Sequence, residues 1–389
     1  MTDAPRPNRL AFATRAVHAG QSPDPTTGAV MQPIYATSTY AQSSPGVHKG
    51  WVYARGANPT REAFERCIAD LESGAHGYAF ASGLASIATL LELLSPGDHV
   101  ICGDDLYGGS YRLFERVRRR SAGLDFSYVD LGDLDAVRAA LKPNTKMLWV
   151  ETPTNPMLKL ADLAALAEIA RGRGLISVAD NTFASPVIQR PLEFGFDAVM
   201  HSTTKYLNGH SDSVGGMVVV RHAPHVEWLT FYQNAAGAIL SAFDSWLILR
   251  GTKTLAVRMA AHNRNGQVIA EYLSTHPRIE QVHYPGLPAH PQHALAQQQM
   301  RGYTGMVSFT VGTLDRARTV LEHVRLFALA ESLGGVESLV SHPATMTHAS
   351  VPVERRDALG VTDSLVRLSV GIEDVDDLQA DLEQALARL

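Results

Sequence analysis

The sequence has few cysteines and no long apolar run. Among its 389 residues only Cys67 and Cys102 are cysteines. These are too few for the disulfide framework of a small secreted domain, and they fit a reducing compartment. No run of about 18 apolar residues is present that could cross a membrane as a helix. Met1–Arg9 is polar and contains proline, so we expect no secretory signal there and a cytoplasmic protein.

An excess of one charge sign and the common nucleotide motifs are also lacking. The net charge of −5 predicts neither nucleic acid nor an anionic membrane as a partner. The one basic run, Arg118–Arg120, is typical of a solvated helix face. Neither G-x-G-x-x-G nor a P-loop pattern occurs. His283, His290 and His293 lie in a proline-rich stretch without cysteine or carboxylate ligands, so no metal site is predicted.

What the sequence does contain is an alternation of short apolar runs and amphipathic stretches, from about residue 75 to 220. This alternation predicts an α/β domain with a mostly parallel sheet. The predicted strands are Tyr78–Ala81, His99–Cys102, Phe126–Val129, Met147–Val150, Ile176–Ala179, Ala198–His201 and Met217–Val220. The predicted helices between them include Leu84–Leu94, Ser110–Arg120 and Leu163–Arg171.

Three parts are predicted along the chain: an arm (1–60), a large α/β domain (61–256) and a smaller α/β domain (257–389). The arm has too few periodic apolar residues to fold alone, so we expect it to pack elsewhere or on a second subunit. Thr60 is expected to cap a helix from Arg61 to about Glu72. The expected elements of the last part are Arg258–Thr275, Gly305–Val311, Asp315–His323, Leu365–Val370 and Val375–Leu389.

Polar residues follow the predicted strands, at the sheet edge where ligands of α/β proteins bind. Gly83 follows the first strand, in a sharp turn at the start of a helix. This turn either binds an anion or is an ordinary βα turn. Tyr107 follows the second strand, and its ring either has a function at the sheet edge, such as stacking, or only packs against its neighbours. Asp180 follows the fifth strand. Its carboxylate either caps a helix or holds a protonated ring nitrogen. Lys205, after Ser202-Thr203-Thr204, is either solvated or able to form a Schiff base.

Each of these features is ambiguous alone, but together they match one cofactor. Pyridoxal phosphate needs a lysine for its aldehyde, a helix N-terminus with hydroxyls for its phosphate, and an aspartate for its pyridinium. In the last predicted strand, Arg367 stands among apolar residues. It needs a carboxylate partner, which is either internal or supplied by a ligand.

With these residues the chain resembles the Cys/Met-metabolism family of pyridoxal-phosphate enzymes, from about residue 14 to the end. Such a resemblance implies fold type I, the aspartate aminotransferase-like fold of α/β class, with a mostly parallel seven-stranded sheet and a smaller C-terminal α/β domain. The segments that carry it are Tyr35–Tyr40, Asn58–Arg61, Glu151–Pro156, Asp180–Phe183, Ser202–Tyr206, Asn208–His210 and Leu329–Gly335.

The resemblance implies roles on the cofactor side of the site. Lys205 carries the cofactor as a Schiff base, Asp180 holds the pyridinium nitrogen, and Tyr107 stacks on the ring. The residues implied to bind the phosphate and the rest of the cofactor are Gly83, Leu84, Asn155, Thr182, Ser202 and Thr204. Tyr53 and Arg55 reach the phosphate in a neighbouring subunit, so a homotetramer built from two dimers is expected.

On the substrate side, the resemblance gives Arg367, helped by Ser332, the role of binding the α-carboxylate. The remaining substrate residues implied are Arg112, Asn155, Glu331 and Thr347. The two catalytic residues are Lys205, which moves a proton from Cα and then from Cβ, and Tyr107, which protonates the departing thiolate.

Within the family, members that cleave cystathionine on its γ side resemble the chain most. The expected reaction converts L-cystathionine and water to L-cysteine, 2-oxobutanoate and ammonia, with β-elimination and hydrogen sulfide release as side activities. Val52 is a departure, because such lyases often carry an acidic residue there that grips the distal ammonium group. Two alternatives stay open: γ-synthesis from an activated homoserine ester and cysteine, and an inert cofactor-binding regulator or scaffold.

Overall fold

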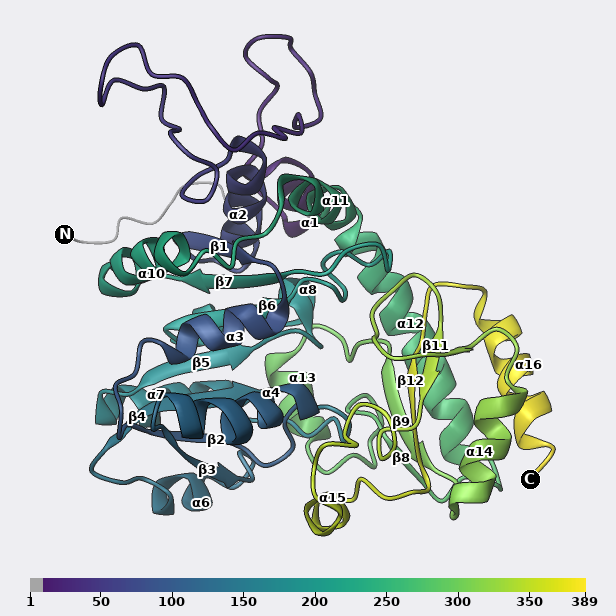
Figure 1. The fold of residues 1–389 in the computed structure, drawn as a ribbon. Coiled ribbons are helices and arrows are strands. Elements are labelled where there is room, and N and C mark those ends of the chain that lie inside the picture. The colour runs from purple at the N-terminus through teal and green to yellow at the C-terminus, as the bar shows by residue number, and fades with distance from the viewer. Residues whose placement is uncertain (1–9) are drawn as a thin grey trace.

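The computed structural model describes residues 10–389, and Met1–Arg9, where no secretory signal was expected, lies outside this range. Two α/β parts lie side by side, each around its own sheet (Figure 1). The seven-stranded sheet and the smaller C-terminal sheet confirm the predicted fold class. No helix within residues 10–389 is long and apolar enough to cross a membrane. The boundaries at residues 60 and 256 stay a prediction.

All seven predicted strands are present in the large sheet. Its order is β1-β7-β6-β5-β4-β2-β3, and only β7 runs antiparallel to its neighbours. Because β2, β7 and the Met147–Val150 part of β4 are buried on both faces, they appear in the sequence as largely continuous apolar runs. The strands are β1 (His76–Phe80), β2 (His99–Gly103), β3 (Asp125–Val129), β4 (Thr145–Glu151), β5 (Ile176–Asp180), β6 (Ala198–Ser202) and β7 (Gly216–Val220).

Helices cover both faces of the large sheet, with one apolar core on each side (Figure 1). The predicted stretch Ser110–Arg120 is not one helix but α4, a π-helical segment η1, and α5. The helical elements are α1 (Phe12–His18), α2 (Pro59–Leu71), α3 (Gly83–Leu91), α4 (Gly108–Arg112), η1 (Leu113–Arg118), α5 (Arg119–Ser121), α6 (Leu134–Ala139), α7 (Leu163–Arg173), α8 (Ser185–Ile188), α9 (Pro191–Phe194), α10 (Ala223–Ala236) and α11 (Ala242–Thr252).

The predicted cap of α2 was wrong by two residues. Asn58, not Thr60, is the cap, and its side chain accepts hydrogen bonds from the backbone N–H groups of Thr60 and Arg61. Pro59 occupies the first helical position, where its missing N–H costs nothing. The Thr60 hydroxyl instead donates to Pro33 O at 2.8 Å and accepts from Tyr35 N at 2.9 Å. It therefore ties the arm to α2.

The smaller part is a five-stranded sheet of order β10-β11-β12-β9-β8. Its strands are β8 (Gln281–His283), β9 (Met306–Thr310), β10 (Ala328–Leu329), β11 (Leu339–Ser341) and β12 (Leu365–Ser369). Three of its helices pack their apolar residues with this sheet in one core. The helices are α12 (Leu255–Thr275), α13 (His293–Gln299), α14 (Leu314–His323), α15 (Val353–Leu359) and α16 (Val375–Leu386).

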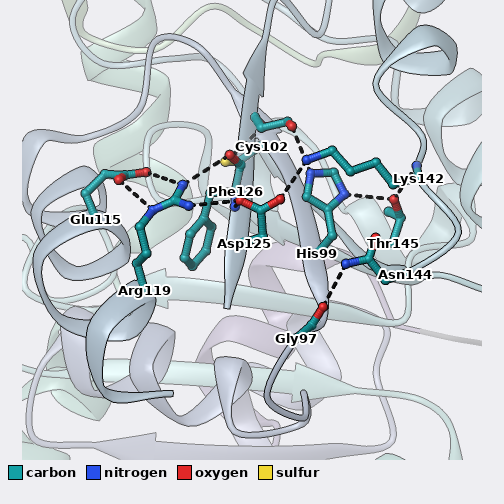
Figure 2. A network of polar contacts seen from close by, with 11 residues as sticks. Gly97, His99, Cys102, Glu115, Arg119, Asp125, Phe126, Lys142, Asn144 and Thr145 are labelled. Carbon is teal, nitrogen blue, oxygen red and sulfur yellow. Dashed lines mark hydrogen bonds and ion pairs between the residues drawn. The ribbon is translucent and has the colours of Figure 1, made fainter. Parts of the chain in front are cut away.

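A polar network joins the first residues of three neighbouring strands, at the edge of the large sheet opposite the predicted site (Figure 2). Asp125 at the start of β3 accepts from Arg119 at 2.9 Å and from Lys142 at 2.6 Å. At the start of β2, His99 lies 2.8 Å from the hydroxyl of Thr145 at the start of β4. These contacts stabilise the sheet far from any predicted chemistry.

Asp125→Ala should lower the free energy of unfolding by about 1 kcal/mol or less, because both ion pairs are partly exposed and screened. Lys142 and Arg119 lower the pKa of Asp125 to about 2, with Lys142 contributing most. The stabilisation is therefore complete above the ordinary value of 3.8 and is lost as pH falls through 2. Urea unfolding at low and high salt measures the effect, with the more exposed Asp135→Ala as the control. A large fall in turnover would contradict this assignment.

Candidate active site

A cavity of about 300 Å³ lies at the carboxyl edge of the large sheet, where the smaller part meets it. It is the only cavity in the described part of the chain that gathers the predicted residues. All of them line it except Tyr53, Arg55 and Arg112; those present are Gly83, Leu84, Tyr107, Asn155, Asp180, Thr182, Ser202, Thr204, Lys205, Glu331, Ser332, Thr347 and Arg367. The strand-end rule thus accounts for the residues of the large sheet, from Gly83 to Lys205, whereas Glu331, Ser332, Thr347 and Arg367 come from the smaller part.

The start of α3 forms one wall of the cavity. Ser82 caps this helix, and its hydroxyl accepts from Ala85 N at 3.1 Å. A Cβ at Gly83 would lie 2.8 Å from the Cβ of Ser202, so only glycine lets the helix N-terminus approach β6 this closely. Free N–H groups and nearby hydroxyls are what an anionic phosphate needs. This wall fits the phosphate of pyridoxal phosphate.

Two buried carboxyl groups lie side by side on the floor of the cavity. Asp180 ends β5 next to Glu151, which ends β4. Burial raises the pKa of Asp180, against hydrogen bonds from the hydroxyl and N–H of Thr182 at 2.5 and 3.0 Å. Burial, and next the charge of Asp180, raise the pKa of Glu151 well above its usual value. Such a pair is stabilised by a cation, and a protonated pyridine nitrogen fits that need.

Lys205 follows β6 and points its amine across the cavity. Its Nζ donates to Ser332 Oγ at 2.6 Å, between the two parts of the chain. Burial, assisted by the positive charge of Arg367, lowers the pKa of Lys205 to about 8. An amine with this pKa is partly neutral near physiological pH, as a nucleophile or a proton carrier requires.

Arg367 lies in β12 and reaches the cavity from the smaller part. Its Nη1 donates to Asn155 Oδ1 at 2.7 Å, and its Nη2 donates to Ser332 O at 3.1 Å. Its Nε is buried and has no partner among residues 10–389. Burial lowers the pKa of Arg367 to about 10. The internal carboxylate pair, one of the two expectations for Arg367, is not seen in this range, and the group is suited to a ligand carboxylate.

Tyr107 precedes α4 and is held through its backbone. Its N–H donates to Glu151 Oε2 at 3.0 Å, which connects the ring to the carboxyl floor. A Cβ at Gly109 would lie 2.4 Å from the Tyr107 ring, so only glycine at this position leaves room for the ring. Burial raises the pKa of Tyr107, although Arg112 opposes this. The phenol therefore keeps its proton near neutral pH and is able to donate it.

Three predicted residues do not line the cavity in this chain. Tyr53 and Arg55 lie in the segment between α1 and α2, which projects away from both sheets (Figure 1). Arg55 donates to Asn234 O at 2.5 Å, and its guanidinium lies 5.6 Å from the Tyr53 ring centre. Arg112 is exposed at the end of α4. Their roles in a neighbouring subunit or at the cavity mouth stay predictions.

Several lining residues had no role assigned from the sequence. The most informative is Glu151, which also accepts from Asn155 N at 3.1 Å and so orders the loop after β4. Its position at a strand end was the available signal. Ser82, the cap of α3, is a second polar one. The others are apolar and lacked a chemical signal: Ile87, Phe183, Met200, Val214 and Leu333.

One cavity thus combines a helix N-terminus, a buried carboxyl pair, a lysine with a lowered pKa and an arginine that has no carboxylate partner among residues 10–389. This combination fits a pyridoxal-phosphate-dependent enzyme. The family model "Cys/Met metabolism PLP-dependent enzyme" matches residues 13–387, and the chain belongs to this family. The predicted family and cofactor are therefore confirmed, and the inert alternative is not supported.

Similar proteins carry three different activity names. A cystathionine β-lyase of Coxiella burnetii is 61% identical over 96% of this chain and 97% of its own length. A cystathionine γ-lyase of Dictyostelium discoideum is 53% identical over 98% and 99%. A cystathionine γ-synthase of Mycobacterium tuberculosis is 52% identical over 96% of each chain. The crystal structure of cystathionine γ-lyase from Lactobacillus plantarum complexed with L-serine has a TM-score of 0.95 at 47% identity, covering 97% and 99%.

Proposed function

We propose that the protein is a cystathionine γ-lyase, which converts L-cystathionine and water to L-cysteine, 2-oxobutanoate and ammonia. The observation that carries the proposal is a pair of opposite charges lining one cavity. The buried guanidinium of Arg367 suits the α-carboxylate of an amino acid. Glu331 makes no ion pair among the described residues, and its carboxylate suits the second ammonium group of cystathionine.

The cofactor side of the cavity would hold pyridoxal phosphate through the α3 N-terminus, Ser202, Thr204, Asp180 and Lys205. Pyridoxal phosphate, when bound, supplies an electron sink for negative charge that develops at a substrate carbon. Asp180 would keep the ring nitrogen protonated, and the Tyr107 ring would stack on the cofactor. These assignments are supported by the cavity lining and by the buried carboxyl pair.

The proton transfers fall to two side chains of this chain. Lys205 Nζ, with its pKa lowered to about 8, would take a proton from the substrate Cα and deliver it to the bound cofactor, and the neutral amine would then take a second proton from Cβ. The Tyr107 hydroxyl, protonated because its pKa is raised, gives a proton to the departing sulfur. Arg367 and Ser332 hold the α-carboxylate during both transfers, so the substrate stays aligned with Lys205.

The competing activity is γ-synthesis, since a relative with that name is 52% identical. Two parallel assays with the same enzyme concentration separate the two functions. One offers L-cystathionine and measures 2-oxobutanoate; the other offers O-succinyl- or O-acetylhomoserine with L-cysteine and measures cystathionine. The proposal requires a larger kcat/KM in the first assay. A larger value in the second would replace it by the synthase.

Glu331→Val should lose about 1.5–3 kcal/mol of cystathionine recognition, the usual value for a hydrogen bond to a charged group. This loss corresponds to a fall on the order of 10- to 150-fold in kcat/KM. Val52 lies in the arm and supplies no charge, so Glu331 carries the discrimination. Methionine cleavage should stay equal or improve, because a carboxylate facing an apolar group pays for desolvation. Steady-state kinetics on both substrates decide this, and an equal fall for both would mean that Glu331 only supports the pocket.

We further propose that the arm completes the site of a neighbouring subunit in a dimer of dimers. Tyr53 is partly exposed, and Arg55 has no carboxylate partner among residues 10–389. Arg55→Ala should weaken cofactor affinity by about 1.5–3 kcal/mol. Equilibrium dialysis measures the affinity and size-exclusion chromatography the oligomer, with the exposed arm variant Lys49→Ala as the control. Parental cofactor affinity in Arg55→Ala would exclude a shared site.

A further inference from the structure

Arg355 makes an unusual contact between the two parts of the chain. It lies on α15 of the smaller part, and its guanidinium carbon is 4.9 Å from the ring centre of Tyr111 and 4.2 Å from that of Tyr128. These rings belong to α4 and β3 of the large part, and their centres are 5.3 Å apart. Arg355 Nη2 also donates to Asp104 O at 3.0 Å. A planar guanidinium suits such a double contact better than an ammonium group.

The segment just before α15 reaches the cavity. We call residues 342–352, which connect β11 to α15, the strap. Thr347 in the strap lines the cavity together with Glu331 and Arg367. The strap is held at its first end, where His342 Nε2 lies 2.8 Å from Asp363 O. At its other end it runs into α15, whose position the Arg355 contact fixes.

The strap also packs on the loop that carries Tyr107. A Cβ at Gly108 would lie 2.4 Å from Thr347 O, so only glycine permits this approach. His348 is buried, and its Nε2 lies 3.3 Å from Leu106 O. The strap thus contacts the Tyr107 loop at Leu106 and at Gly108, on either side of Tyr107. A displacement of α15 would move Thr347, whereas Tyr107 stays held from β4 through its hydrogen bond to Glu151.

We propose that Arg355 is a positioning residue that sets substrate recognition. Its contacts with Tyr111 and Tyr128 anchor the strap on the Tyr107 loop and thereby fix the substrate-facing wall of the cavity. The groups placed on the cofactor side, from the α3 N-terminus to Asp180 and Lys205, make no contact with Arg355. This inference rests on the proposed function only for the choice of substrate; the anchoring itself does not depend on it.

Hydrogen exchange in the holoenzyme tests the anchoring directly. In Arg355→Ala, exchange of amides in residues 342–352 should accelerate about tenfold, the size expected when two cation–π contacts and one hydrogen bond are lost. Tyr128→Leu, which removes one ring, should accelerate the same segment. Arg138→Ala, which removes an exposed arginine paired with Asp135, is the matched control and should leave it unchanged. Unchanged strap exchange in Arg355→Ala would overturn the proposal.

Kinetics and cofactor binding test the consequence for the site. Arg355→Ala should raise KM for cystathionine about five- to tenfold, with kcat and cofactor affinity changed by about twofold or less. A fall in cofactor affinity as large as the rise in KM, or faster hydrogen exchange throughout the chain, would make Arg355 a general structural residue and overturn the proposal. If the parent enzyme does not cleave cystathionine, the proposed function fails, whereas the exchange result still decides the anchoring.

Discussion

Lys205→Ala should abolish almost all turnover while the fold is retained. The proton transfers assigned to Lys205 Nζ contribute about 10²–10⁴-fold to the rate, and the covalent link to the cofactor aldehyde is lost as well. The fold should persist because Lys205 Nζ makes a single hydrogen bond among residues 10–389, to Ser332 Oγ. In addition, the substitution removes a mostly buried charge, which is unfavourable in the folded state.

Two measurements separate this role from a structural one. Borohydride reduction should fix the cofactor covalently to the parent protein and to the control Lys146→Ala, whose lysine is exposed near the start of β4. The same treatment should leave Lys205→Ala without fixed cofactor, and its circular dichroism should match the parent. Turnover of cystathionine at near the parental rate in Lys205→Ala would show that the assignment of this lysine is wrong.

Arg367→Leu should have the second largest effect, and it should act on the substrate. Loss of two charged hydrogen bonds to an α-carboxylate costs about 3–4 kcal/mol, a fall on the order of 10²- to 10³-fold in kcat/KM. Arg367→Lys should lose less, because an ammonium group keeps the charge but not the planar pair of donors. Leucine occupies much of the space of the arginine side chain, but Asn155 Oδ1 and Ser332 O lose the hydrogen-bond donors that Arg367 supplies.

Cofactor affinity is the control for Arg367, because none of the groups assigned to the cofactor depends on it for a hydrogen bond except Asn155. Equilibrium dialysis should therefore give an affinity within about threefold of the parent, a difference of less than 1 kcal/mol. If Arg367→Leu and Arg367→Lys lowered cofactor affinity and kcat/KM by the same factor, the role of Arg367 would be to hold the two parts of the chain together and not to recognise the substrate.

The large sheet was predictable because its strands are buried on both faces. A strand such as β4 then appears as an uninterrupted apolar run, a signal that needs no knowledge of the neighbours. In contrast, β8, β10 and β11 contain only two or three residues each, too few to show any period. The α2 cap was misplaced because Asn58 and Thr60 are both good caps. Pro59, which favours the first helical position, was the signal for Asn58, and the Thr60 hydroxyl bonds Pro33 and Tyr35 instead.

The site was predictable wherever its residues follow strands of one sheet. Gly83, Asp180 and Lys205 meet because the carboxyl ends of β5 and β6 and the amino end of α3 share an edge. The partner of Arg367 was not predictable, because its contact with Asn155 spans 212 positions and depends on how the two sheets are placed. For the same reason no sequence pattern indicated that Arg355 lies against Tyr111 and Tyr128.

The central claim is tested most directly by the products formed from L-cystathionine. Cleavage on the γ side gives 2-oxobutanoate and L-cysteine, and cleavage on the β side gives pyruvate and homocysteine. The proposed function predicts that purified holoenzyme releases mostly 2-oxobutanoate, with an equal amount of L-cysteine. A predominance of pyruvate with homocysteine, or no oxo acid while an activated homoserine ester and L-cysteine are joined, would contradict it.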